Sequence, residues 1–122
     1  MTPPDANTVP IIHSLTEVYK EGYKISSKIS KRDRFGIWAH VENELLNCLS
    51  LASEAALETP AQKTSPLKQL RIRLDIVKRL IRLCQELGVL EEKKYFLLQE
   101  KLIETSKMAH GWLVYFERKP RP

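Results

Sequence analysis

The sequence is poor in residues that build disulfide-bonded or metal-stabilised folds. Its 122 residues include only two cysteines and four glycines. Cys48 and Cys84 are far apart and each falls on an apolar helical stripe, so we predict reduced thiols in a core rather than a disulfide or a metal pair. No apolar run approaches the roughly 18 residues of a membrane span, and the N-terminal residues lack the pattern of a secretory signal. We therefore expect a cytoplasmic protein without a membrane segment.

Motifs that would carry catalysis are also missing. There is no Gly-rich phosphate loop, no Cys-x-x-Cys and no His-Glu-x-x-His. His13, His40 and His110 stand alone, and none has a Glu three residues before it, so we expect surface or boundary residues rather than metal ligands. We predict no catalytic residue, no metal and no cofactor. An alternative remains, because Arg34 and His40 have the spacing of an Arg–His pair that activates a 2′-hydroxyl in some all-helical ribonucleases.

The most informative stretch is residues 67–87. Projected as a helix at 100° per residue, it has one apolar stripe with heptad spacing, made of Leu67, Leu70, Leu74, Val77, Ile81 and Cys84. A second stripe lies beside the first and comprises Ile76, Leu80, Leu83 and Leu87. The two stripes cover about 220° of the circumference, whereas one core contact requires only about 100°. We therefore predict a helix that is packed on two sides.

The remaining surface of this helix is basic. We call this surface the basic ribbon, and it consists of Lys68, Arg71, Lys78, Arg79 and Arg82. Asp75 is the only acid on the same side of the predicted helix. Residues 61–90 carry seven Lys/Arg against two acids, which equals the net charge of +5 of the whole chain. A one-sided band of this kind favours contact with a nucleic acid or an acidic protein surface. The alternative is a solvated face held by weak i,i+4 pairs around Asp75.

Three further segments have seams of apolar residues spaced alternately three and four apart, which predict helices beginning near residue 11, over 34–57, and over about 91–116. We expect Asp33 to cap the second of these helices. The basic helix should begin at Ser65-Pro66 and end at Gly88 in a left-handed conformation.

Four helices of about 20 residues with short connections predict an all-α, antiparallel up-down four-helix bundle. The expected organisation is a flexible arm over residues 1–10, the bundle over 11–116 and a basic tail over 117–122. An isolated bundle would leave the second apolar stripe uncovered, so we expect an oligomer that contacts through Arg73, Ile76, Leu80 and Leu83. Arg73 lies in the middle of the apolar arc, where it either extends its charge to water or pairs with a carboxylate at a subunit contact.

The last two predicted helices resemble a known family. The residues that carry the resemblance are the basic, leucine-rich run LRIRLDIVKRLIRLCQELGVL and the later run LIETSKMAHGWLVYF, which ends in an aliphatic–Gly–Trp pattern at 109–113. They are similar to Avd proteins, which are accessory proteins of diversity-generating retroelements, and to proteins encoded in intervening sequences of bacterial large-subunit ribosomal RNA genes. Arg34-Phe35-Gly36 fits loosely. The run AHVENELLNCLSLASEA lacks the Arg-Ala-Ala and Ile-x-x-Asn-Ile-Ala-Glu-Gly type pattern of the second branch, which favours the Avd branch.

The resemblance implies a pentameric ring of four-helix bundles that is not itself an enzyme. It would bind a reverse transcriptase and its template RNA, and possibly DNA, and would support the error-prone cDNA synthesis that diversifies a target gene. Lys78 and Arg82 occupy places where Avd proteins carry basic residues on the outer surface. Two alternatives stay open, namely a general RNA- or DNA-binding bundle without a polymerase partner and a structural oligomeric scaffold.

Overall fold

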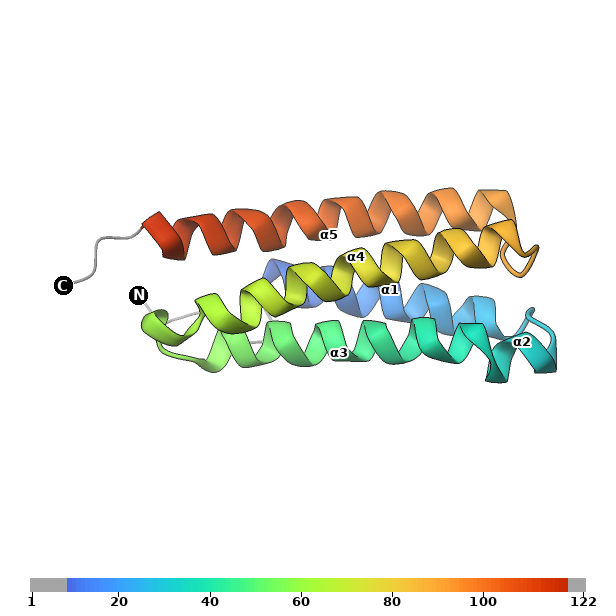
Figure 1. Ribbon diagram of the computed structural model, residues 1–122, viewed down its shortest axis with the longest axis horizontal. Coiled ribbons are helices and arrows are strands. Elements are labelled where there is room, and N and C mark those ends of the chain that lie inside the picture. The colour runs from blue at the N-terminus through green and yellow to red at the C-terminus, as the bar shows by residue number, and fades with distance from the viewer. Residues whose placement is uncertain (1–8, 119–122) are drawn as a thin grey trace.

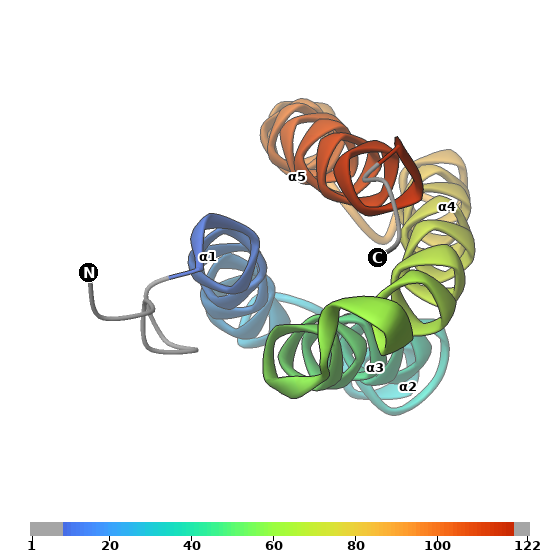
Figure 2. The ribbon, with the colours of Figure 1, turned by 90° about the vertical axis from the view of Figure 1, so that its left-hand side faces the viewer.

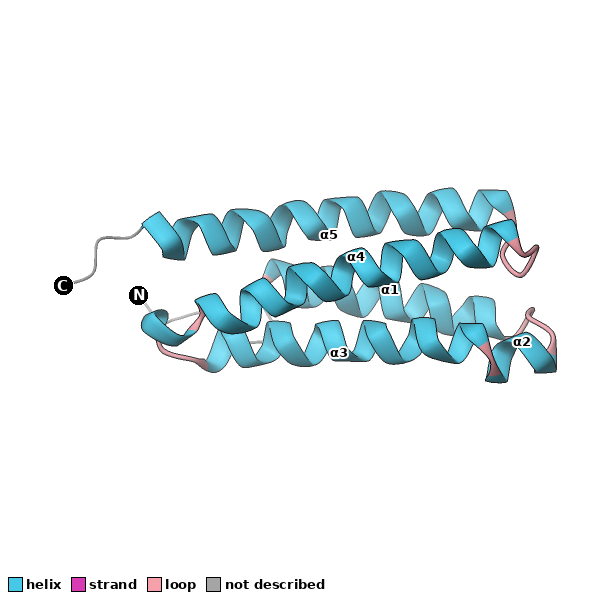
Figure 3. Ribbon diagram, in the orientation of Figure 1, coloured by secondary structure: helices cyan, strands magenta, loops and turns pink. Residues whose placement is uncertain are grey.

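The computed structural model describes residues 9–118, and all regular structure in that part of the chain is helical (Figures 1 and 3). This confirms the predicted all-α class. In chain order the elements are α1 (Pro10–Ser26), α2 (Lys31–Phe35), α3 (Ile37–Leu57), the short 3-10 helix η2 (Pro60–Gln62), α4 (Thr64–Glu86) and α5 (Glu92–Arg118). Residues 1–8 of the predicted arm and 119–122 of the predicted tail lie outside the described residues. Pro10 already begins α1, and α5 continues to Arg118.

The four long helices lie side by side, and the connections between successive long helices fall at alternate ends of the molecule (Figure 1). Viewed from one end, they surround a common interior (Figure 2). Helix α1 packs against α3 and α5, and α4 packs against the same two helices. The basic helix α4 therefore has a neighbour on each flank and one face that no other part of the described chain covers.

Each long helix contributes one apolar stripe to the core. On α4 the first predicted stripe is almost completely inaccessible, with exposed fractions of 0–1% for Leu67, Leu70, Leu74, Val77, Ile81 and Cys84. On α3 the predicted seam is also buried, from Trp38 to Ala55. Both cysteines are free thiols in this core, as predicted. Burial of these stripes supplies the main driving force for folding, at about 25 cal/mol for each Å² of apolar surface removed from water.

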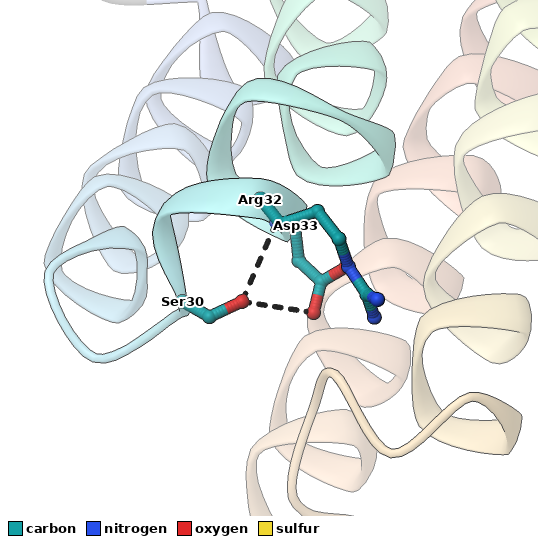
Figure 4. A network of polar contacts seen from close by, with 3 residues as sticks. All are labelled: Ser30, Arg32 and Asp33. Carbon is teal, nitrogen blue, oxygen red and sulfur yellow. Dashed lines mark hydrogen bonds and ion pairs between the residues drawn. The ribbon is translucent and has the colours of Figure 1, made fainter.

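The segment predicted as one helix over 34–57 is divided at Gly36. Helix α2 ends at Phe35 and α3 begins at Ile37, and Gly36 has φ −98° and ψ −116°. The predicted Asp33 cap is wrong, because Ser30 caps the new short helix instead. The Asp33 backbone N–H donates to Ser30 Oγ over 3.4 Å, and Ser30 Oγ donates to the Asp33 carboxylate over 3.1 Å (Figure 4). The predicted apolar seam of this segment begins only at Trp38, so the spacing contained no information about a break at Gly36.

The ends of α4 differ in how well they were predicted. Gly88 has φ +75°, which confirms the left-handed C-terminal glycine. The backbone N–H of the next residue, Val89, donates to the Cys84 carbonyl over 2.8 Å. At the other end the helix begins at Thr64 rather than at Ser65-Pro66, and no side chain caps it.

Lys63, the residue before α4, contacts the ends of both α3 and α5. Its Nζ donates to the backbone carbonyls of Ala55 and Ala56 at the end of α3, over 2.6 and 3.3 Å. The same ammonium lies 5.7 Å from the ring centroids of both Trp112 and Phe116 near the end of α5. Burial lowers the pKa of Lys63 below its ordinary value, and the nearby Glu58 carboxylate acts in the opposite direction.

Two glycines give a matched test of the packing. A Cβ at Gly22 would lie 3.7 Å from a ring carbon of Trp38, an ordinary contact, whereas a Cβ at Gly36 would lie 2.9 Å from the Arg32 carbonyl oxygen. We expect Gly22→Ala to raise the free energy of unfolding by about 0.5–1 kcal/mol, because alanine is the better helix former. Gly36→Ala should lower it, because backbone has to move. Urea unfolding measures both changes, and a loss of stability in Gly22→Ala would show that α1 and α3 approach more closely than described.

Candidate nucleic-acid interface

The basic ribbon lies on one side of α4 outside the core. Lys68, Arg71, Arg79 and Arg82 are exposed, and the side chain of Lys78 is 23% exposed. From residue 68 to residue 82 the ribbon extends for about 21 Å at the rise of an α-helix. That length is enough for contacts with several successive phosphate groups.

Three of these cations have acidic neighbours in the same chain. Lys78 pairs with Asp75 at 3.5 Å, Arg82 with Glu86 at 3.2 Å, and Lys68 with Glu117 of α5 at 3.8 Å. The acids are 45–71% exposed, and ion pairs of this kind contribute about 0–1 kcal/mol. Within residues 9–118, Arg71 and Arg79 form no ion pair. The exposed pairs leave the ribbon able to exchange its carboxylate partners for phosphate.

Arg73 is 45% exposed, in keeping with the first alternative, and it also pairs with a carboxylate of its own chain. Its Nη1 donates to the Glu44 carboxylate of α3 over 3.1 Å, so the carboxylate that it finds belongs to the same subunit. The Glu44 side chain is only 17% exposed. Arg73 therefore ties α4 to α3 in the single chain, and its ion pair requires no second copy.

The second apolar stripe of α4 is only partly covered. Ile76 and Leu80 are half-buried, and Leu80 packs against the edge of the core. Leu83 and Leu87 are 42% and 63% exposed, and Ile72, which the projection did not include, is 62% exposed. Within one chain α4 is thus buried along one stripe and leaves an apolar ridge beside it.

The structure also places residues of α5 beside the ribbon that the sequence analysis did not select. A groove between the two helices is lined by Arg71, Asp75 and Lys78 from α4 and by Ile103, Ser106, Lys107, His110 and Gly111 from α5. Lys107 and His110 are three residues apart and therefore share a face of α5. That spacing was visible in the sequence, but the helix that this face meets was not.

The ribonuclease alternative gains no support from the positions of its residues. Arg34 lies near the end of α2, with its guanidinium 5.4 Å from the ring centroid of Phe35. His40 is exposed in the first turn of α3, beyond the break at Gly36. All three histidines are exposed, as predicted. Residues 9–118 contain no group of three or more His, Cys, Asp or Glu side chains arranged to hold a metal ion.

Comparisons with protein-family models, with curated proteins and with solved structures give no significant match to this chain. Among the described helices, none combines the length and the hydropathy needed to cross a membrane.

Proposed function

We propose that this protein is a non-catalytic, cytoplasmic accessory protein of the Avd type, which binds the template RNA and the reverse transcriptase of a diversity-generating retroelement. In this proposal the chain is an antiparallel up-down bundle that assembles as a pentameric ring. The resemblance of the α4 and α5 sequences to Avd proteins supports the retroelement assignment, and the basic ribbon supports the binding role.

The observation that carries the binding role is the basic ribbon itself. Five cations follow one side of α4, and the acids beside them are exposed. Lys and Arg contacts to phosphate give affinity that does not depend on sequence. In a ring the same ribbon would be repeated, so weak contacts would add through avidity. Specificity would then come from the polymerase or from the shape of the RNA.

The uncovered ridge of α4 supports assembly. Exposed apolar side chains in one patch mark interaction surfaces on soluble proteins, and Ile72, Leu83 and Leu87 are exposed along one side of α4, with the half-buried Ile76 and Leu80 between them. The expected subunit contact through Arg73, Ile76, Leu80 and Leu83 lies along the same side of the helix. Arg73 would enter that contact with its charge already paired to Glu44.

The test of the binding role is the double variant Lys78→Ala/Arg82→Ala. We expect it to fold normally, because neither residue is in the core, and to bind single-stranded RNA roughly tenfold more weakly. The slope of log affinity against log salt should fall by about 1.4, since each contact to a single strand contributes about 0.7. Fluorescence anisotropy with a labelled oligouridylate at several salt concentrations measures both quantities, and circular dichroism checks the fold.

The matched control is Lys20→Ala/Lys28→Ala, which removes the same charge from exposed positions on and just after α1. Its affinity should stay close to that of the wild type. Equal binding by the ribbon variant and the wild type would remove the ribbon from the binding surface. Pull-down of a reverse transcriptase with this protein separates the retroelement role from general nucleic-acid binding, which the sequence-independent chemistry of the ribbon also favours.

A further inference from the structure

We propose that the groove between α4 and α5 is a phosphate-binding site for the backbone of single-stranded RNA, in which Lys107 and His110 of α5 complete a cradle begun by Arg71 and Lys78 of α4. This inference rests on the proposed RNA-binding function and deepens it, because it moves part of the contact surface from α4 onto α5.

The charge of the groove favours an anion. Arg71, Lys78 and Lys107 place three basic side chains around it, His110 is a further donor, and Asp75 is the only carboxylate in the lining. The Lys78 side chain is 23% exposed, whereas Asp75 is 71% exposed. A cation that is partly removed from water interacts more strongly with a ligand charge than one in bulk solvent. The carboxylate can turn toward water when a phosphate takes its place.

The size of the groove fits more than a bare ion. Its volume is about 400 Å³, within the range of sites that hold small organic ligands. Ile103 is 47% exposed and gives the groove an apolar side, against which a ribose or a base can pack. Ser106 also lines it, and its buried hydroxyl has no hydrogen-bond partner among the described residues. Cations beside an apolar contact suit a nucleotide unit of a strand.

The walls of the groove are held in place by contacts between the two helices. Gln99 Nε2 of α5 donates to the backbone carbonyl of Lys78 over 3.2 Å. Lys68 of α4 pairs with Glu117 of α5 at 3.8 Å, farther along both helices. The Gln99 hydrogen bond holds one end of the groove in place before a ligand arrives, whereas the exposed Lys68–Glu117 pair at the other end adds little to this. Such preorganisation lowers the entropy cost of binding.

The groove and the basic ribbon form one continuous path. Arg71 and Lys78 belong to both, so a strand that follows the ribbon passes the mouth of the groove. Gly111 leaves the α5 wall open at this point, and a Cβ added there would meet no atom within 4 Å. A side chain can therefore be introduced at Gly111 without a clash, which allows the groove to be blocked without disturbing the ribbon.

The test uses the double variant Lys107→Gln/Gly111→Glu in the full-length protein. It leaves every cation of the ribbon in place, removes one groove cation and adds a carboxylate to the wall. We expect roughly tenfold weaker binding of a labelled oligouridylate at low salt, with a salt slope reduced by about 0.7 for the lost contact. The control Lys93→Glu/Gly111→Ala makes the same change in net charge at an exposed residue of α5 outside the groove, and it should bind like the wild type.

The outcomes separate this inference from the function on which it rests. If the groove variant binds like the wild type while Lys78→Ala/Arg82→Ala binds weakly, the groove assignment is wrong and the binding role of the ribbon stands. If the wild type does not bind the oligouridylate, both proposals fail. Competition against the labelled oligouridylate identifies the ligand. If uridine monophosphate or oligoglutamate displaces it at the same concentration as the unlabelled strand does, the assignment to an RNA backbone is wrong.

Discussion

Native protein at pH 8 is expected to react with a thiol reagent at least a hundredfold more slowly than the unfolded chain. Cys48 and Cys84 both have exposed fractions of 0%. Burial, reinforced by the Glu44 carboxylate and opposed by Arg73, raises the pKa of Cys48 from 9.0 to about 12. Burial together with Asp33 raises the pKa of Cys84 to about 11. Because the thiolate is the reactive form, its population at pH 8 falls by about a thousandfold for Cys48 and about a hundredfold for Cys84.

The absorbance of the released thionitrobenzoate measures the rate of this reaction, with guanidinium-unfolded protein as the control. Rapid labelling of the folded protein would show that the core opens far more readily than described.

The same pKa shifts predict a loss of stability in alkali. Since both folded-state pKa values are raised, the stabilising effect of the neutral thiols is complete below pH 9 and is lost as the pH rises toward 11 and 12.

Substituting Leu83 with glutamate is expected to separate the subunits of the proposed ring. Leu83 lies on the uncovered ridge of α4 and is 42% exposed, so the substitution leaves the core intact. A carboxylate buried in a subunit contact without a partner costs several kcal/mol at each interface. Sedimentation velocity at micromolar concentration should show the change from the proposed ring to a monomer.

Leu46→Glu is the matched control for the ridge. Leu46 is 41% exposed, but it lies on α3 outside the second apolar stripe of α4. This variant should sediment like the wild type. A wild-type protein that is itself a monomer under these conditions would contradict the ring, and dissociation of both variants would place the contact elsewhere than on the ridge.

Much of the fold follows from spacing alone. The heptad positions from Leu67 to Cys84 are all buried, because residues three and four apart share one side of a helix and apolar side chains leave water together. The left-handed conformation of Gly88 could also be predicted, since a glycine after the last apolar position commonly ends a helix. The break at Gly36 could not be predicted from apolar spacing, because the seam of this segment begins only at Trp38 and no proline marks the break.

Only part of the candidate site could be predicted from the sequence. Lys68, Arg71, Lys78, Arg79 and Arg82 were visible because one helix determines their relation to one another. The position of Lys107 and His110 beside Arg71 depends on how α5 is rotated against α4, which is set by packing across the core. The pairing of Arg73 with Glu44 likewise depends on the register between α3 and α4. A pattern within one segment contains no information about either.

The ammonium of Lys63 has a consequence for how the molecule moves. It donates to two carbonyls near the end of α3, directly precedes α4 and lies against two rings of α5, so the ends of three helices share one contact. None of the three can loosen there without releasing the other two. Fraying at this end should therefore be a concerted event, with amide protons of all three segments exchanging together, rather than the independent unwinding of separate helix tips.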